Sequence, residues 1–536
     1  MNRLIPFTVL LWSVTANAQI ISVELLQSFT IENVYAEMDD LGVPPGFLPV
    51  NYAVDFYRVE YTTIHPNGSP VTVSGAVCVP VSEGCSFPLS SYQHGTIARR
   101  TDAPSFLSTE GMICVLYASA GYVSIAADYI GLGTSPGMHL YVHADSEAST
   151  CIDLLHATVE LQEQLNYTLN DELFIWGYSQ GGHATAALQR ALETDAESPF
   201  TLTGSAPMSG PYDVSGVQAA VITGNDPYPT PGYLPYVVFS YQEAYGGILY
   251  NDISEVFVAP YDELLPGLFD GNTSMGTINN QCPDVPSQML QPALLELFQN
   301  DPQHPMRVAL ADNDLLDWAP QAPTRLLYCN ADDQVNYMNS EVAYDAYIAL
   351  GSTSVESIDL GAYDHGFCAP FAMFDGFQFF ESLRLAPFNP TVNETITASN
   401  GTDGIINVDV FAPGQWTHEW AHGEMNLSAF GLAPGTYYLT ITSEEGCSVG
   451  FMYEVPEAVG VGELSAGGLS VWPNPAEDQL RVKYTARTQA ELLDQSGRIV
   501  LQLQLLPETL IDLSLLESGV YMLRTIDGEV VRVVKR

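Results

Sequence analysis

Residues 177–181, Gly-Tyr-Ser-Gln-Gly, fit the Gly-x-Ser-x-Gly pattern, in which a serine hydroxyl acts as a nucleophile. An apolar run precedes them at 173–176, and a run of helix-forming residues follows at 182–192. A sharp turn between a strand and a helix holds a serine hydroxyl clear of the sheet, beside the positive end of the helix. The surroundings therefore predict that Ser179 is a catalytic nucleophile.

A second stretch, residues 133–137, fits the same pattern as Gly-Thr-Ser-Pro-Gly. It also follows an apolar run, at 122–130, but Pro136 and the polar, aromatic residues after it do not begin a helix. Because the five-residue pattern alone is weak, the context decides between the two. It predicts that Ser135 is an ordinary loop residue.

A serine nucleophile needs a base within hydrogen-bond reach and a carboxylate that orients this base. On a turn of this kind, the chain order is serine, acid, histidine. His365 lies in a loop between a strand-like and a helix-like run, so we expect it to be the base. His183 lies four residues after the serine in the following helix, where its geometry is wrong, so we expect a structural role. His304 falls between two prolines in a separate segment.

The acid is expected in residues 326–335, Leu-Leu-Tyr-Cys-Asn-Ala-Asp-Asp-Gln-Val. An apolar strand delivers two adjacent aspartates to a loop at its carboxyl end, where α/β sites lie. Asp332 has the Asp-x-x-Val spacing that is common at this position, so it is favoured over Asp333. Asp364 is a third candidate, disfavoured because it is the direct neighbour of His365 in the sequence.

Attack on a carbonyl group also needs two N–H groups that face the developing negative charge. The backbone N–H of Gln180, directly after the nucleophile, is expected to be the first. The second is expected from Thr96, in the loop 91–96 (Ser-Tyr-Gln-His-Gly-Thr) that follows an early apolar strand. Gly95 allows a close approach of the backbone, although an ordinary turn would also use a glycine here.

Apolar strand-like runs alternate with helical stretches over residues 19–388, which predicts an α/β fold with a mostly parallel sheet. Residues 210–320 break this alternation and are rich in proline, tyrosine and glycine. We expect them to form a helical cap over the site. The strands are expected at 71–79, 89–92, 122–127, 173–176 and 325–329, with a helix at 149–165.

Residues 50–388 resemble the α/β-hydrolase superfamily and, within it, the secretory lipases and esterases. The resemblance rests on residues 92–96, 128–133 and 177–182 and on the Asp332 and His365 loops. It implies a carboxylic-ester hydrolase with an acyl-enzyme intermediate, in which Ser179 attacks the ester carbonyl and His365 takes its proton. It implies a small-molecule or lipid ester as substrate, with no metal and no cofactor.

Two modules rich in strand-like runs follow. Residues 389–458 show short alternating strands with glycine turns, which predicts a small β-sandwich. They resemble the repeat of surface adhesins in Bacteroidetes, which implies a spacer or adhesion role. After a glycine-rich linker at 459–468, residues 472–476 (Trp-Pro-Asn-Pro-Ala) and 519–524 (Gly-Val-Tyr-Met-Leu-Arg) stand in a second predicted β-sandwich, 469–536. That module resembles the C-terminal sorting domain of type IX secretion in Bacteroidetes. It implies the secretion machinery as a partner and a secreted or cell-surface location.

Residues 418–422, His-Glu-Trp-Ala-His, fit the zinc-protease pattern HExxH. That chemistry needs both histidines on one face of a helix. Pro413, Gly414 and Gly423 bound a short stretch in a β-rich setting, where positions four apart on a strand are separated by about 13 Å. No zinc site is therefore predicted.

The first 18 residues are expected to be a signal peptide, with Arg3, an apolar run at 4–14 and a small-residue cleavage site at 16–18. No later segment is apolar for long enough to predict a transmembrane span. The formal net charge of −47, with Lys483 and Lys535 as the only lysines, argues against a nucleic-acid partner. It suits solubility in a saline setting.

Eight cysteines in an exported chain permit disulfides. Cys78 and Cys85 flank a short turn and are candidates to pair with each other. Cys329 and Cys368 lie near the predicted acid and base loops and are a second candidate pair. Cys447 lies in a different module, so we expect one or more free thiols.

The leading hypothesis is a secreted serine esterase or lipase. A serine peptidase on the same fold is an alternative, because a serine, histidine and aspartate do not distinguish an ester from an amide. The other alternative is a catalytically inactive hydrolase that serves as a surface adhesin.

Overall fold

The computed structural model describes residues 19–44, 46–82, 84–385, 390–412, 414–444, 446–457, 469–484, 487–494, 497–526 and 529–536. The predicted signal peptide, 1–18, and the predicted linker, 459–468, lie outside these residues. The chain divides into two compact units. The first comprises the chain up to Thr391 with Phe411–Glu419 and Leu439–Phe451, and the second comprises the other residues.

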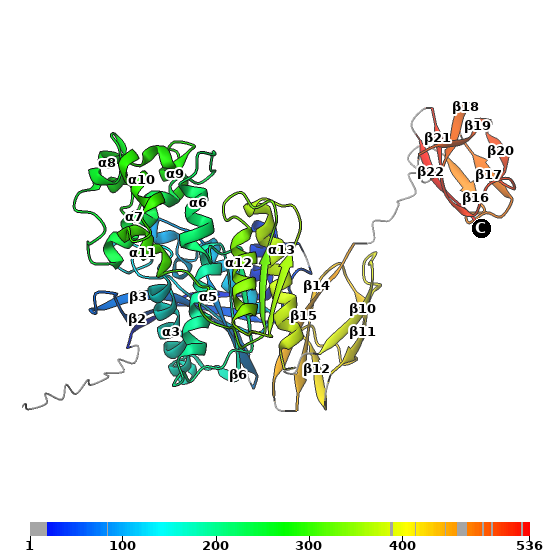
Figure 1. The fold of residues 1–536 in the computed structure, drawn as a ribbon. Helices are drawn as coiled ribbons and strands as arrows, with labels where there is room; N and C mark the ends of the chain where they lie inside the picture. Colours follow the sequence, from blue (N-terminus) through cyan, green and yellow to red (C-terminus); the bar gives the residue numbers. More distant parts are fainter. Residues whose placement is uncertain are drawn as a thin grey trace, which may run out of the picture. The chain divides into compact units, whose positions relative to one another are not determined.

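A nine-stranded sheet forms the centre of the first unit, in the order β1-β2-β3-β5-β4-β6-β7-β8-β9 (Figure 1). The pairs among β1, β2, β3 and β5 are antiparallel, and those from β5 through β4 to β9 are parallel. This confirms the predicted α/β fold with a mostly parallel sheet. The strands are β1 (Ile20–Phe29), β2 (Ala53–Ile64), β3 (Pro70–Val81), β4 (Ser86–Gln93), β5 (Val123–Ala127), β6 (Thr168–Tyr178), β7 (Gly204–Met208), β8 (Thr324–Tyr328) and β9 (Val355–Asp359).

Helices cover both faces of this sheet, which is why central strands such as β5 and β7 are buried along their whole length. One hydrophobic core lies between the sheet and the helices α1 (Ile31–Asp40), α2 (Thr109–Ser119) and α13 (His365–Leu383). The cores that involve α3 (Ala144–Glu160), α5 (Gln180–Thr194) and α12 (Met338–Ala349) lie on the other face. The short helix α4 (Gln162–Leu165) follows α3.

The segment between β7 and β8, drawn in green in Figure 1, forms short helices around two small cores, one of which also includes residues of the loops after β4 and β5. Hydroxyl groups on its longest helix, α7 (Tyr233–Ala244), donate to backbone carbonyls of the loops after β4 and β5. These bonds join Tyr236 to Ile97, Ser240 to His139 and Tyr241 to Val142. The other helices are α6 (Ala219–Ile222), α8 (Tyr261–Leu264), α9 (Met275–Asn279), α10 (Pro292–Asn300) and α11 (Pro305–Ala311).

Two three-stranded sheets, β10-β11-β13 and β12-β14-β15, follow the hydrolase-like part of the chain. Their alternating apolar positions and glycine turns produce the predicted small β-sandwich. The HExxH sequence begins on strand β12, so its histidines do not share a helical face. The strands are β10 (Thr391–Thr397), β11 (Gly404–Phe411), β12 (Trp416–Trp420), β13 (Ala429–Leu432), β14 (Gly435–Ser443) and β15 (Ser448–Val455).

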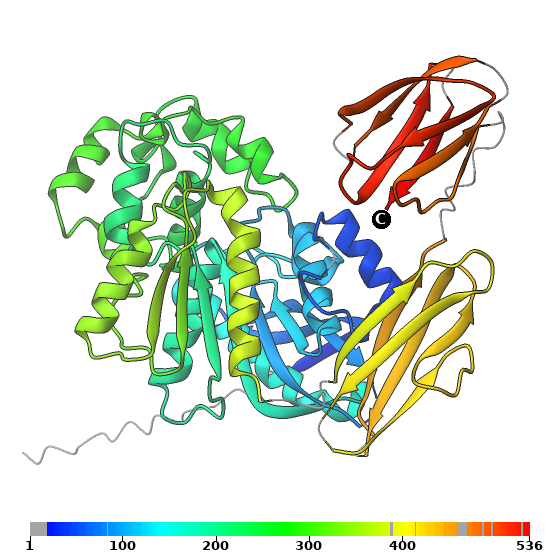
Figure 2. The same ribbon diagram turned by 90° about the vertical axis from the view of Figure 1, so that its right-hand side faces the viewer.

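The last module has its own hydrophobic core between the sheets β16-β17-β20 and β19-β18-β21-β22, and Figure 2 shows its strands in orange and red. Side chains on these strands alternate between buried and exposed, as expected for a sandwich. None of the helices among the described residues is long and apolar enough to cross a membrane. The strands are β16 (Ser470–Trp472), β17 (Gln479–Lys483), β18 (Thr488–Leu493), β19 (Ile499–Leu505), β20 (Glu508–Asp512), β21 (Gly519–Thr525) and β22 (Val530–Lys535).

The cysteine pairing differs from the expectation in one respect. Cys85 is bonded to Cys447, 362 residues away, and not to Cys78. Cys78 lies in the core on the α2 face of the sheet, whereas Cys85 lies in the core on the opposite face, so the short turn cannot bring them together. The N–H of Gly450 also donates to the carbonyl of Asn51, at 3.1 Å, so the start of β15 is joined to the first unit.

Peptide mapping of the folded, non-reduced protein is expected to recover Cys85 linked to Cys447, and Cys329 linked to Cys368. Burial raises the pKa of the Cys78 and Cys151 thiols, so a maleimide should label them only after denaturation. A peptide that links Cys78 to Cys85 would contradict the structure.

Candidate active site

Ser179 occupies the turn between β6 and α5 with a φ of 64°, a backbone conformation that non-glycine residues rarely adopt. The turn is crowded: a Cβ atom on Gly177 or Gly181 would overlap the carbonyl oxygen of Gln93 at the end of β4. A Cβ atom on Gly182 would overlap the carbonyl oxygen of Met208 at the end of β7. The three glycines are therefore required by the close approach of two neighbouring strands.

His365, the first residue of α13, links this serine to an aspartate. Its Nε2 atom lies 2.9 Å from the Ser179 hydroxyl oxygen, and its Nδ1 atom lies 2.7 Å from a carboxylate oxygen of Asp332. The side chains of His365 and Asp332 are 8% and 1% exposed, so little water competes for these bonds. Tyr178 donates its hydroxyl to the His365 carbonyl at 2.7 Å, which joins the turn to the start of α13.

The three candidate aspartates lie close to His365 in three different roles. Asp332 bonds to the imidazole and also accepts the N–H groups of Gln334 and Val335, which accounts for the Asp-x-x-Val spacing. Asp333 accepts the backbone N–H of His365 at 3.2 Å. Asp364 caps the helix by accepting the N–H of Phe367. The disulfide between Cys329 and Cys368 ties the acid loop to the first turn of α13.

The loop after β4, which carries Thr96, passes beside the turn that carries Ser179. A Cβ atom on Gly95 would lie 3.6 Å from the carbonyl oxygen of Tyr178. Among the described residues, the backbone N–H groups of Thr96 and Gln180 have no hydrogen-bond acceptor, so both can serve a substrate oxygen. The Thr96 hydroxyl lies 3.1 Å from that of Tyr141, which lines the pocket described below.

Asp128, directly after β5, joins β3 to the segment that follows β4. Its buried carboxylate accepts the hydroxyls of Ser74 and Ser105, both at 2.5 Å. Burial raises the pKa of this carboxyl group, and the hydrogen bonds from Ser105 and Ser74 partly offset the increase. The next residue, Tyr129, stacks on the ring of His94 in the loop after β4.

The other histidines and the second Gly-x-Ser-x-Gly serine lie apart from this chain of hydrogen bonds. His304 is the N-cap residue of α11 and lines the pocket described below. Ser135 is buried in the loop between β5 and α3, and its hydroxyl has no partner among the described residues. His183 is fully buried against Glu147, with 2.7 Å between Nδ1 and the carboxylate. Sequence reasoning missed Glu147, which is one of four acidic residues on α3 and has no local pattern that distinguishes it from the others.

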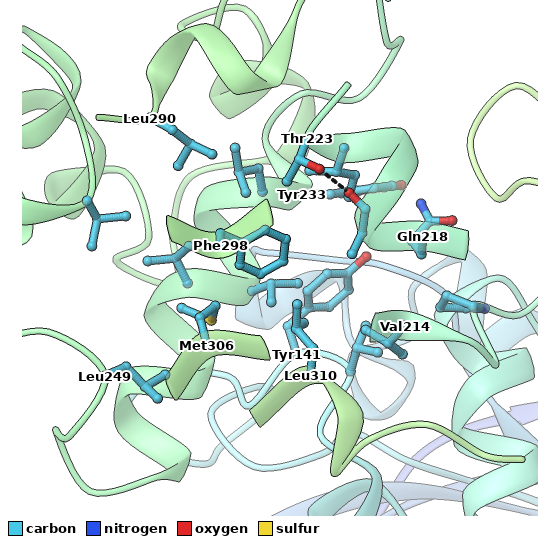
Figure 3. Close-up of a pocket in the computed structure, with 18 of the residues that line it drawn as sticks. Tyr141, Val214, Gln218, Thr223, Tyr233, Leu249, Leu290, Phe298, Met306 and Leu310 are labelled. Atoms are coloured by element: carbon cyan, nitrogen blue, oxygen red, sulfur yellow. Dashed lines mark hydrogen bonds between the residues drawn. The ribbon is translucent and has the colours of Figure 1, made fainter. Parts of the chain in front are cut away.

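A mostly apolar pocket opens above Ser179 and Gln180, with about 1040 Å³ of empty space including its mouth. Figure 3 shows side chains of the segment between β7 and β8 turned toward a common space, together with Tyr141. The lining includes Val214, Val237, Leu249, Leu290, Phe298, Met306 and Leu310.

The same segment also holds the loop of the predicted acid. Tyr228 donates its hydroxyl to the carbonyl of Gln334 at 2.7 Å, and the side-chain amide of Gln218 donates to the same oxygen at 3.1 Å. Tyr233 donates to the side chain of Gln334 at 3.2 Å. Gln334 is two residues after Asp332, so the pocket wall and the acid loop are held in one arrangement.

Comparison with solved structures identifies esterases and other hydrolases over the first two thirds of the chain. The ligand-bound form of the rice cell wall degrading esterase LipA from Xanthomonas oryzae is 31% identical, with a TM-score of 0.59, and the match covers 68% of this chain and 95% of that one. A Legionella pneumophila protein described as a hydrolase is 28% identical, with a TM-score of 0.64 and coverages of 68% and 98%. Candida antarctica lipase A, 15% identical with a TM-score of 0.53 and coverages of 68% and 81%, shares the fold.

The end of the chain, residues 470–536, matches the family model of the secretion system C-terminal sorting domain. A comparison with curated protein sequences finds no match. The fold and the solved structures define the class as an esterase- or lipase-like hydrolase. The chain belongs to the α/β-hydrolase superfamily and carries a type IX secretion sorting domain at its C-terminal end.

Replacing Gly181 by alanine tests whether the close packing of the turn determines the position of Ser179. The new Cβ would overlap the Gln93 carbonyl, so Gly181→Ala is expected to lower stability by about 1–3 kcal/mol and to displace Ser179. Gly276→Ala is the control, since it adds a methyl group to a helical glycine with no atom nearby. Thermal unfolding and ester hydrolysis would be measured for both variants. Equal stability and equal activity of Gly181→Ala and Gly276→Ala would show that the contact with the Gln93 carbonyl does not position Ser179.

Proposed function

We propose that this protein is a secreted serine esterase that hydrolyses carboxylic esters through an acyl-enzyme intermediate. The observation that carries the proposal is the chain of hydrogen bonds from Asp332 through His365 to Ser179, beneath an apolar pocket. The similarity to an esterase and other hydrolases favours the same chemistry. The proposal needs no metal and no cofactor, because the side chains supply the nucleophile, the base and the acid.

In the first step, the Ser179 oxygen forms a bond to the ester carbonyl carbon while His365 takes the hydroxyl proton at Nε2. The Asp332 carboxylate accepts the Nδ1–H bond and stabilises the resulting imidazolium. The tetrahedral intermediate expels the alcohol, which takes the proton from His365. Water then adds to the acyl-serine with the same base, and the acid leaves as Ser179 regains its proton.

The negative charge on the tetrahedral oxygen is met by the N–H groups of Gln180 and Thr96 in this proposal. Gln180 begins α5, so the positive end of this 15-residue helix also faces the oxygen. Neither N–H has another acceptor among the described residues, so neither must break a bond within the protein to serve the intermediate.

The pocket favours an ester with an apolar acyl part. Its walls are mostly aliphatic and aromatic side chains, and its few polar groups include Ser179 and Gln180 at the reacting end. A hydrocarbon chain laid along these walls gains about 0.8 kcal/mol for each buried methylene group. The substrate is therefore proposed to be a small-molecule or lipid ester with a medium or long acyl chain.

The sorting domain gives the proposed location. We infer that the type IX secretion machinery recognises residues 470–536 and that the hydrolase acts outside the cell or at its surface. The two-sheet module at 391–455 is proposed to be a spacer or adhesion module, and part of it is fixed to the first unit by the Cys85–Cys447 bond.

The nucleophile can be tested with a matched pair of serine variants. Ser179→Ala is expected to lower kcat on p-nitrophenyl esters by roughly 10⁴-fold or more, because the covalent step is lost. Ser135→Ala is expected to retain full activity, since that serine lies in the other Gly-x-Ser-x-Gly sequence and its hydroxyl has no partner among the described residues. A fluorophosphonate probe should label the wild type and Ser135→Ala but not Ser179→Ala.

The same probe separates the alternatives. No labelling of Ser179 in the folded protein would favour the inactive adhesin. Labelling with clear turnover of aminoacyl anilides, and none of esters, would favour the peptidase and would contradict the esterase.

The acyl site can be tested by filling the pocket. Val237→Trp adds bulk to the pocket wall, so kcat/KM for a decanoate ester is expected to fall roughly tenfold or more relative to an acetate ester. Val308→Trp is the control, because Val308 lies in the same segment but is 50% exposed and outside the lining. An unchanged ratio of decanoate to acetate in Val237→Trp would show that the chain binds elsewhere.

A further inference from the structure

Beside Ser179 lies a buried polar cluster whose side chains the chemistry above does not use. It consists of Glu147 on α3, Gln180 and His183 on α5, and His139 in the loop after β5. Glu147 and His183 are completely buried, Gln180 is 1% exposed and His139 is 3% exposed. Burial of polar groups is costly unless they are paired, and here every group except the Gln180 amide oxygen has a partner among the described residues. The pairing of the Gln180 amide nitrogen therefore indicates what the cluster holds in place.

The hydrogen bonds fix the orientation of the Gln180 amide. His139 has its Nδ1 atom 3.0 Å from the carbonyl oxygen of Ile130, so this nitrogen must carry the hydrogen. Burial lowers the pKa of His139 to about 4, so at neutral pH its Nε2 atom is an acceptor. The amide nitrogen of Gln180 lies 2.9 Å from this Nε2 and 2.8 Å from Glu147 Oε1. A flipped amide would place its oxygen against two acceptors.

Glu147 in turn is held by His183. The second carboxylate oxygen, Oε2, lies 2.7 Å from His183 Nδ1, and His183 Nε2 lies 3.0 Å from the carbonyl oxygen of Asn313. Since a carbonyl oxygen only accepts, Nε2 carries a hydrogen, and one further proton is shared between Nδ1 and the carboxylate. Glu147 thus bridges His183 and Gln180, which lie three positions apart on α5, nearly one turn of the helix.

We propose that Glu147, His183 and His139 are positioning residues, which hold the Gln180 side chain and thereby aim the Gln180 backbone N–H at the oxygen of the tetrahedral intermediate. The inference rests on the proposed function, because it matters only if this N–H serves that oxygen. The position of Gln180 in the turn explains why its side chain must be held in place. Gln180 comes directly after the strained Ser179, and its own N–H has no acceptor among the described residues.

The cluster acts on the transition state and not on substrate binding. The charge on the carbonyl oxygen appears only after attack, so a misaimed N–H lowers kcat and leaves KM nearly unchanged. Complete loss of one such donor costs about 10²–10³-fold in kcat, and a looser donor is expected to cost less.

Gln180→Met tests the proposal, because it keeps the backbone N–H and removes both side-chain bonds. Gln189→Met is the matched control. Gln189 is a second buried glutamine on α5, and its amide bonds to Thr324 and Glu193 near the other end of the helix. Steady-state kinetics on p-nitrophenyl butyrate would be normalised to the sites titrated by a fluorophosphonate, and thermal unfolding would be recorded for each variant.

The expected result is a kcat that falls at least about tenfold in Gln180→Met, with KM within about twofold and full titration of Ser179. Gln189→Met should lose thermal stability but keep its kcat. A native kcat in Gln180→Met, or an equal loss in both variants, would overturn the proposal while leaving the serine mechanism standing. Failure of Ser179 to be titrated in the wild type would instead overturn the proposed function.

Two variants of Glu147 provide a second readout. Glu147→Gln can still accept from Gln180 and can donate to a neutral His183, whereas Glu147→Leu removes both of these bonds. Among the described residues, the Gln180 side chain would then keep only its bond to His139, and His183 only its bond to the Asn313 carbonyl. The kcat of Glu147→Gln should exceed that of Glu147→Leu by about fivefold or more at equal titrated sites. Equal kcat values would overturn the positioning role. If Glu147→Leu does not fold, the comparison of Gln180→Met with Gln189→Met decides alone.

Discussion

The close approach of β4 and β7 to the turn after β6 is the constraint on which the rest of the site depends. Carbonyl oxygens of Gln93 and Met208 occupy the space that side chains at Gly177, Gly181 and Gly182 would need. The chain therefore reverses so sharply that Ser179 takes a φ of 64°. This conformation places the serine hydroxyl at the carboxyl edge of the sheet and the first N–H of α5 beside it.

Other parts of the molecule meet at this turn, and each is tied to it or to its neighbours. Tyr178 bonds to the carbonyl of His365, and the Cys329–Cys368 disulfide joins the acid loop to the helix that begins with His365. The pocket segment bonds to Gln334, two residues after Asp332. A rigid site surrounded by an apolar wall suits a reaction whose oxyanion must be stabilised by groups already in position.

Much of this arrangement could be predicted from the sequence, because the chemistry resides in local patterns. The Gly-x-Ser-x-Gly turn and its surroundings predicted Ser179. The Asp-x-x-Val spacing after an apolar strand favoured Asp332, and a loop between strand-like and helix-like runs favoured His365. The structure brings the three within hydrogen-bond distance. Glu147 was missed because it is one of four acidic residues on α3, and its partners Gln180 and His183 are more than 30 residues away in the sequence. The Cys78–Cys85 pair was wrong because spacing along the chain does not show that the two thiols lie on opposite faces of a sheet.

The sequence by itself determined the fold class, the sorting domain and the residue types of the proposed reaction, since strand alternation, glycine turns and short motifs are properties of neighbouring residues. Only the tertiary structure decided that Asp333 accepts the backbone N–H of His365, that Cys85 pairs with Cys447, and that four polar side chains are buried together beside Ser179. These contacts join residues from separate elements. Tertiary packing determines these contacts, and the periodicity of the sequence does not predict them.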